Sequence, residues 1–187
     1  MPDPEDLTQG AVRKTLDDAV FTLGVHLAGL SAGQLADLRR MRPGDGTGAF
    51  WRVYYAPKVA LDQQRGTAFD WEWVVHALAL LTPTGNDPNK LSAHDGKLRL
   101  GQALHNLGIS EMRVAQVLEA PLDQRRDHLL RLVRLLARER LRFNTTDLAR
   151  LLLPNSLDPR DPKHPLRRLA QSYYAAAAAA EKGNSDA

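Results

Sequence analysis

The spacing of the apolar residues constrains this chain more than any other feature, because they recur every three or four positions along most of its length. Rows such as Leu100, Leu104 and Leu107 lie on one side of a helix, whereas a half-buried strand requires alternating apolar and polar residues. The segment AFWRVYYA, residues 49–56, has the aromatic and β-branched composition of a strand. No second segment offers it a partner strand, so we expect a helix there and an all-α fold.

Capping and helix-breaking residues divide this pattern into a bundle of about eight to nine helices. Ser31 is a predicted N-cap, Gly108 ends one helix, and Pro121 and Pro154 stop two others. The predicted helices cover residues 7–27, 32–40, 49–56, 69–81, 97–108, 110–120, 122–143, 144–153 and 166–180.

A polar, proline-bearing stretch, TPTGNDPNKLSAHDG, is the best candidate for a boundary inside the chain. We therefore expect two packed lobes: an N-terminal helical lobe over residues 1–82, a linker over 83–97 and a C-terminal helical lobe over 98–180. Residues 181–187 form a predicted disordered tail. A chain of 187 residues is long enough for one substantial core or for two small lobes that share an interface.

The distribution of charge favours an anionic partner for the C-terminal half. Residues 1–98 hold 10 Lys/Arg against 12 Asp/Glu, whereas residues 99–187 hold 15 against 10, and the window 125–168 holds 12 against 5. Arginine supplies 19 of the 25 basic residues, and its planar guanidinium binds phosphate oxygens in pairs. Clustered arginine of this kind is typical of nucleic-acid-binding surfaces.

The segment HLLRLVRLLARERLRF, residues 128–143, concentrates this charge on one side of a predicted helix. Four arginines fall within about 80° of one another at the helical period: Arg131, Arg134, Arg138 and Arg142. The row is about 16 Å long, which spans about five phosphates of a single strand. Like charges four residues apart repel each other, so an anion-binding face and a solvated face both remain open.

A second basic cluster, LRRMRPGDG, contains Arg39, Arg40 and Arg42. The cluster has a structural explanation, because positive charge stabilises the C-terminal end of a helix. The functional alternative is a corner that holds a phosphate. The glycines that follow make no nucleotide-binding motif, since no Walker lysine comes after them, so we expect a flexible turn.

Several classes of function lack a sequence signal. The chain has no cysteine, its six histidines lack metal-ligand spacing, and no nucleophile motif or pair of juxtaposed carboxylates appears, so we expect no enzyme, metal or cofactor. No apolar run approaches the roughly 20 residues that cross a bilayer, and MPDPEDLTQG is unlike a leader, so we expect a cytoplasmic protein without membrane contact. The aromatic residues are predicted to be core: Phe50, Trp51, Tyr54, Phe69, Trp71 and Trp73.

An ordered series of segments resembles the CasB family, the small subunits of the type I-E CRISPR Cascade effector. The series is QLADLRRMRPG, AFWRVY, LRLGQALHNLGISEMRVAQVLEA, LLRLVRLLARE, DLARLLL and RRLAQSYY, from about residue 30 to 174. The family often has a tryptophan before the final tyrosine, where this chain has Leu169 and Ala170, and the alanine run after Tyr174 has no counterpart.

The resemblance implies a non-enzymatic helical protein, present in two copies along a guide-RNA complex and in contact with its backbone and large subunits. Its basic surface would stabilise the pairing of guide RNA with target DNA and hold the displaced strand. The family positions carried over are Arg39, Arg40, Arg52, Arg99, Arg113, Arg131 and Arg134. Arg42, Arg138 and Arg142 come from the two basic clusters themselves.

Two other functions remain open at this stage. A helical DNA-binding transcriptional regulator would need polar base-reading residues on a recognition helix, and ISEMRVAQVLEA is only a weak candidate. A bundle that binds only proteins would not need the arginine row.

Overall fold

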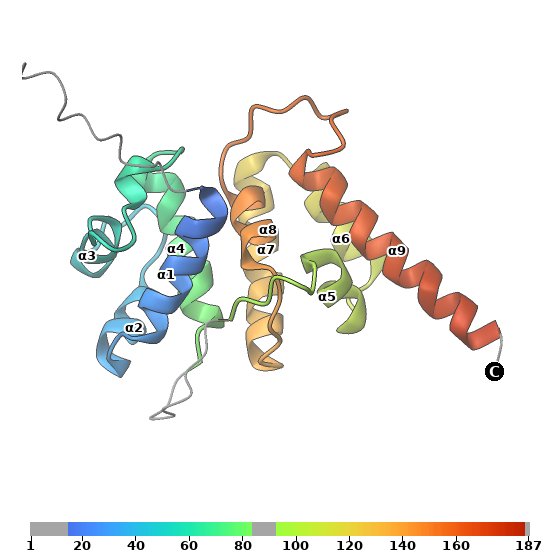
Figure 1. The fold of residues 1–187 in the computed structure, drawn as a ribbon, viewed down its shortest axis with the longest axis horizontal. Coiled ribbons are helices and arrows are strands. Elements are labelled where there is room, and N and C mark those ends of the chain that lie inside the picture. Colours follow the sequence, from blue (N-terminus) through green and yellow to red (C-terminus); the bar gives the residue numbers. More distant parts are fainter. Residues whose placement is uncertain (1–14, 84–92, 186–187) are drawn as a thin grey trace, which may run out of the picture.

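A computed structural model describes residues 15–83 and 93–185 of the chain and confirms the all-α fold (Figure 1). The described residues form nine α-helices and one short 3-10 helix, Leu61–Gln63. The α-helices are α1 (Leu16–Ala28), α2 (Ala32–Arg40), α3 (Gly48–Tyr54), α4 (Ala68–Leu81), α5 (Leu100–Asn106), α6 (Glu111–Glu119), α7 (Leu122–Arg138), α8 (Thr145–Leu152) and α9 (Pro165–Ser185). The predicted helical residues 7–14 and most of the predicted linker, residues 84–92, lie outside the described residues.

Helix starts follow the capping signals in the sequence. The predicted N-cap Ser31 accepts a hydrogen bond from the Gln34 backbone, and the Gln34 side chain accepts one from the Ser31 backbone. Thr15 and Thr67 form the same reciprocal arrangement at the starts of α1 and α4, and Asn144 caps α8. Each cap satisfies backbone N–H groups that the first turn of a helix leaves without partners.

The pair α4 and α7 lies at the centre of the molecule, as Figure 1 shows. Helices α1, α2 and α3 pack around α4, while α5, α6 and α9 lie beyond α7, with α8 between the two groups. A single cluster of buried apolar side chains runs through both halves, from Val20 in α1 to Tyr173 in α9. The division into two lobes remains a prediction.

The guanidinium of Arg126 in α7 is buried where α4, α7 and α8 meet, with 2% of the side chain exposed. It donates hydrogen bonds to the Asp70 carboxylate of α4 and, over 2.9 Å, to the Leu152 carbonyl at the end of α8. Its charge also lies 5.5 Å and 5.6 Å from the ring centroids of Phe69 and Trp73. Pairing, hydrogen bonding and ring contacts together compensate for the loss of water around a buried cation.

Helix α9 crosses α5 at a backbone-to-backbone contact that only glycine allows. A Cβ atom on Gly101 would collide with the Ser172 side chain and the Leu169 carbonyl, and would lie 2.6 Å from the Tyr173 backbone nitrogen. The Tyr173 hydroxyl then donates a hydrogen bond to the Ile109 carbonyl over 2.6 Å. The first half of α9 is therefore fixed against α5 and the start of α6.

The prediction of one helix over residues 122–143 is wrong, because α7 ends at Arg138. Arg140 adopts a left-handed backbone conformation, with φ of 51°, and its N–H reaches the Ala137 carbonyl while that of Leu141 reaches the Leu136 carbonyl. These two bonds form a Schellman motif, in which glycine is the usual left-handed residue. The sequence has arginine there, so the usual stop signal is missing.

At the other end of the chain, α9 continues to Ser185, five residues past the predicted end at Ala180. Alanine, glutamate and lysine are strong helix formers, and residues 175–182 consist of these alone. Residues 186–187 of the predicted tail lie outside the described residues.

We predict that Arg140→Gly stabilises the protein by about 0.5–1 kcal/mol, because glycine adopts the left-handed conformation without a clash between Cβ and backbone. This gain corresponds to a rise in melting temperature of about 1–4 °C for a chain of this size, measured by thermal unfolding. Arg140→Ala is the control, since it removes the same charge and keeps the strain. Equal melting temperatures for the two variants would contradict the prediction.

We also predict that Arg126→Ala destabilises the fold by about 3–5 kcal/mol, since it leaves the Asp70 carboxylate buried without its partner. Arg131→Ala, on the exposed side of the same helix, should change stability by less than about 0.5 kcal/mol. The double variant Arg126→Met with Asp70→Asn should recover most of the loss, because neither charge then remains buried and the amide oxygen can still accept from the Thr67 N–H at the start of α4. Denaturant unfolding measures all three, and similar values for Arg126→Ala and Arg131→Ala would refute the assignment.

Candidate nucleic-acid interface

A groove between α6 and α7 brings together three of the arginines predicted from the sequence. One part, of about 350 Å³, is lined by Arg113, Gln116, His128, Arg131, Leu132 and Leu135. An adjoining part, of about 290 Å³, is lined by Leu107, Gly108, Ile109, Arg113, Leu135, Arg138 and Glu139. Arg113 and Leu135 line both parts, so the two lie next to each other along α6 and α7, and together they are called the α6–α7 groove below.

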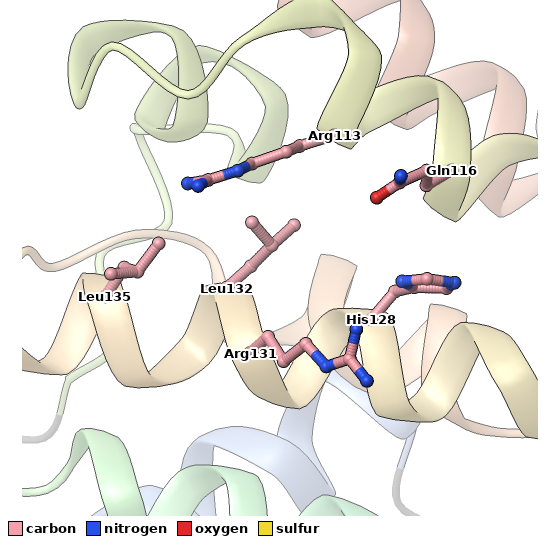
Figure 2. A pocket seen from close by; sticks show the side chains of 6 residues that line it. All are labelled: Arg113, Gln116, His128, Arg131, Leu132 and Leu135. Carbon is pink, nitrogen blue, oxygen red and sulfur yellow. The ribbon is translucent and has the colours of Figure 1, made fainter.

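The walls of this groove come from two helices that pack against each other. Figure 2 shows Arg113 and Gln116 on α6 facing Leu132 and Leu135 on α7, with Arg131 on the α7 side. Val114 and Val117 are buried, which turns Arg113 and Gln116 of α6 to the surface. The floor is therefore apolar, and the cations stand at its rims.

The three rim arginines are exposed and have no carboxylate partner within residues 15–83 and 93–185. The lining contains one carboxylate, that of Glu139, and three guanidinium groups, those of Arg113, Arg131 and Arg138. The groove therefore has an excess of positive charge on side chains that can reach a ligand.

Arg134 belongs to the same exposed side of α7 but does not line the groove. At the helical period it lies about 60° from Arg131, on the side away from Leu135. Its charge acts instead on the buried His76 of α4, whose pKa lies below its usual value mainly through burial and partly through Arg134. The groove therefore uses Arg131 and Arg138 of the row, while Arg134 lies outside it on the same exposed side of α7.

Sequence reasoning missed two polar residues of the groove, Gln116 and His128. Helical spacing could have found them, because Gln116 comes three residues after Arg113 and His128 comes three before Arg131. Neither residue is a lysine or an arginine, so a search for clusters of these two residue types passed over both.

Arg142 does not continue the arginine row of α7, so the prediction from helical spacing is wrong at this position. Because α7 ends at Arg138, Arg142 lies in the segment that pairs with residues 93–98, where Asp95 N–H donates to the Phe143 carbonyl over 2.8 Å. The Arg142 guanidinium donates to the His94 carbonyl over 2.9 Å.

Two further predicted residues already have intramolecular partners. Arg39 is half-buried and donates to the Ala79 and Thr82 carbonyls at the end of α4. Arg99 lies 2.9 Å from the Asp147 carboxylate. Arg40, in contrast, is exposed and pairs with Asp37 at the surface, where such a pair contributes little stability.

The glycine turn after α2 is anchored, whereas the sequence predicts a flexible turn. The carboxylate of Glu72, 4% exposed, accepts hydrogen bonds from the Gly44 and Gly46 N–H groups over 2.6 Å and 3.4 Å. Both glycines have positive φ values, which directs their N–H groups toward this carboxylate. The amides that a phosphate-holding corner would need are thus occupied by an internal anion.

Arg52 of α3 and Arg42 of the preceding loop are exposed, and so are two aromatic side chains that were predicted to be core. The prediction of a core position is wrong for Trp51 and Phe69, which are 38% and 45% exposed. It holds for Phe50, Tyr54 and Trp71, which are buried, while Trp73 is half-buried. A helix as short as α3 shows no period long enough to reveal its buried side.

Within the described residues, no group of three or more histidine, aspartate or glutamate side chains could hold a metal ion. None of the described helices is both long and apolar enough to traverse a bilayer.

Comparison with known proteins gives one family. The model of a family described as CRISPR-associated protein Cse2 matches residues 34–174, more than half of the chain. No curated protein and no solved structure matches the chain significantly. The matched residues include α6 and α7 and hence both walls of the groove.

We predict that Arg39, with its half-buried hydrogen bonds, and Arg40, with its exposed ion pair, differ in their effect on stability. Arg39→Ala should cost about 1–3 kcal/mol, because it leaves two carbonyls at the end of α4 without donors. Arg40→Ala, the neighbouring change, should cost less than about 0.5 kcal/mol. Denaturant unfolding measures both, and equal costs would show that the Arg39 hydrogen bonds do not stabilise α4.

Proposed function

We propose that the α6–α7 groove holds the backbone of nucleic acid within the type I-E Cascade complex. The chain belongs to the family of CRISPR-associated protein Cse2 and is therefore a subunit of that complex. The proposed ligands are phosphates of the displaced DNA strand and of the guide RNA paired with target DNA. The observation that carries this proposal is the groove itself, with Arg113 on one wall and Arg131 and Arg138 on the other.

The spacing of these cations suits a strand of nucleic acid. Arg131 and Arg138 lie two helical turns apart, or about 10 Å along the axis of α7. Successive phosphates of one strand advance by about 3.4 Å, so the two arginines span about three nucleotides. Arg113 on the opposite wall could bind the same backbone from its other side.

The chemistry of the groove supports holding a strand more than reading its sequence. Arginine contacts to phosphate position a nucleic acid without distinguishing its bases. In a guide-RNA complex, base pairing with the guide supplies the sequence recognition. The exchange of one duplex for another is nearly balanced in free energy, so a few backbone contacts shift it toward the opened target.

The rest of the proposal follows from family membership. We propose a non-catalytic, cytoplasmic protein that contacts the backbone and large subunits of Cascade and a second copy of itself. Arg40, Arg42, Arg52 and Arg134 are exposed and could extend the nucleic-acid contacts beyond the groove. Arg39, Arg99 and Arg142 already have intramolecular partners. To bind phosphate, each would have to give up its partner.

We predict that the combined variant Arg113→Ala, Arg131→Ala and Arg138→Ala binds single-stranded DNA at least about 10-fold more weakly than the wild type at low salt. Loss of three phosphate contacts should also reduce the slope of log affinity against log salt by about 2. Fluorescence anisotropy of labelled oligonucleotides of two unrelated sequences measures both effects, and the two sequences should bind alike.

The matched control removes the same charge elsewhere, through Arg160→Ala, Lys163→Ala and Lys182→Ala, three exposed positions away from the groove. This variant should keep nearly the wild-type affinity. Equal losses in the two triple variants would mean that net charge alone governs binding. Wild-type binding by the groove variant would refute the groove as the binding surface.

A further inference from the structure

Helix α3 presents two aromatic rings and a guanidinium to solvent on a single face. Phe50, Val53 and Tyr54 are buried on its inner side. On the outer side, Trp51 is 38% exposed and Tyr55, directly after the helix, is 62% exposed. Arg52 lies between them in the chain and is also exposed. Large aromatic side chains that remain exposed together usually mark a binding surface.

The two outer rings lie nearly parallel to each other. The centroids of Trp51 and Tyr55 are 5.8 Å apart, and their planes differ by 17°. Edge-on contacts support the indole from within, from Phe50 at 5.1 Å and from Tyr54 at 5.6 Å between centroids. The two rings are therefore held against each other at the surface, and both stay partly exposed.

The anchored glycine turn holds this face in place from the side. A Cβ atom built on Gly46 would lie 3.5 Å from the indole nitrogen of Trp51, so the turn lies directly against the ring. Glu72 fixes the same turn through its hydrogen bonds to Gly44 and Gly46. A ring held in this way loses little conformational entropy when a ligand binds.

The outer face combines flat rings with positive charge. The charge comes from Arg52, which is exposed and has no carboxylate partner among the described residues. Single-stranded nucleic acid offers the complementary groups, since unpaired bases have flat faces and each is joined to a phosphate. Proteins that bind single strands without sequence preference use this pairing of aromatic rings and cations.

We propose that the α3 face formed by Trp51, Arg52 and Tyr55 is a stacking platform for unpaired bases of single-stranded nucleic acid. The rings would stack on one or two bases while Arg52 contacts the adjoining phosphate. The inference rests on the proposed function, because it assigns the platform to a strand that the α6–α7 groove also holds. It adds base contacts on a second surface to the phosphate contacts proposed for the groove.

The platform is spatially separate from the groove. Figure 1 shows α3 and α6 on opposite sides of the central pair α4 and α7. A variant at either surface can therefore be made without altering contacts at the other, and their effects on binding should be separable.

The test compares two labelled oligonucleotides of equal length and charge, an oligothymidylate and its abasic analogue, which keeps the phosphates and lacks the bases. For the full-length chain, Trp51→Ala with Tyr55→Ala should weaken oligothymidylate binding about 5- to 150-fold, the range for loss of one stacked base. Its affinity for the abasic strand should stay unchanged. The groove variant should lose affinity for both strands.

Three control variants and one fluorescence measurement keep the outcome interpretable. Trp51→Phe keeps a ring and should keep the preference for bases, and Phe21→Ala removes an exposed ring from α1 and should have no effect. Trp51 is more exposed than Trp71 and Trp73, so oligothymidylate should also quench wild-type tryptophan emission more than the abasic strand does. Tyr55→Ala alone, at the more exposed position, addresses any folding defect of the double variant.

The outcomes separate the two proposals. Equal wild-type affinity for the two oligonucleotides, unchanged in the double variant, would overturn the platform and leave the groove standing. Binding of neither oligonucleotide by the wild type would overturn both. A base preference that is lost with the rings and retained in Trp51→Phe would establish the platform.

Discussion

The buried cation of Arg126 is the interaction on which the arrangement of the molecule depends. It joins α7 to the Asp70 carboxylate of α4 and to the last carbonyl of α8, and these are the helices through which the two halves of the chain meet. A buried ion pair adds little net free energy over an apolar contact, but it tolerates few alternative packings. The Arg126–Asp70 pair therefore acts mainly on the positions of the helices. It holds α7, which forms one wall of the groove, against α4, on which α3 packs.

Arginine serves two different purposes in this chain, and the difference lies in its partners. Arg39, Arg126 and Arg150 meet carbonyls or carboxylates of distant helices and hold the fold together. Arg113, Arg131 and Arg138 face solvent along the groove without such partners. The repulsion between Arg131 and Arg138 is tolerated because Arg126 and the apolar core already stabilise α7, the helix that carries both.

Local signals were enough to predict the helices but not the use of each arginine. Ser31 and Gly108 marked helix ends because capping depends on residues close in sequence. The end of α7 escaped notice, since its left-handed residue is Arg140 and the bonds around it stabilise a conformation that arginine disfavours. The partners of Arg39 and Arg126 lie 40 and 56 residues away, at Ala79 and Asp70, so no helical period could reveal them. The exposure of Trp51 was equally hidden from the sequence, because the ring lies beside a glycine turn that Glu72, from a different helix, holds in place.

The contact at Gly101 has a mechanical consequence for the long helix α9. Beyond Tyr173 the helix continues for about 18 Å and leaves the body of the protein, as Figure 1 shows. With its pivot at Gly101, a tilt of about 10° moves the far end by about 3 Å. The Tyr173 hydroxyl joins this lever to Ile109, which lines the groove. The base of this long helix and the groove wall beside Arg113 therefore share a contact.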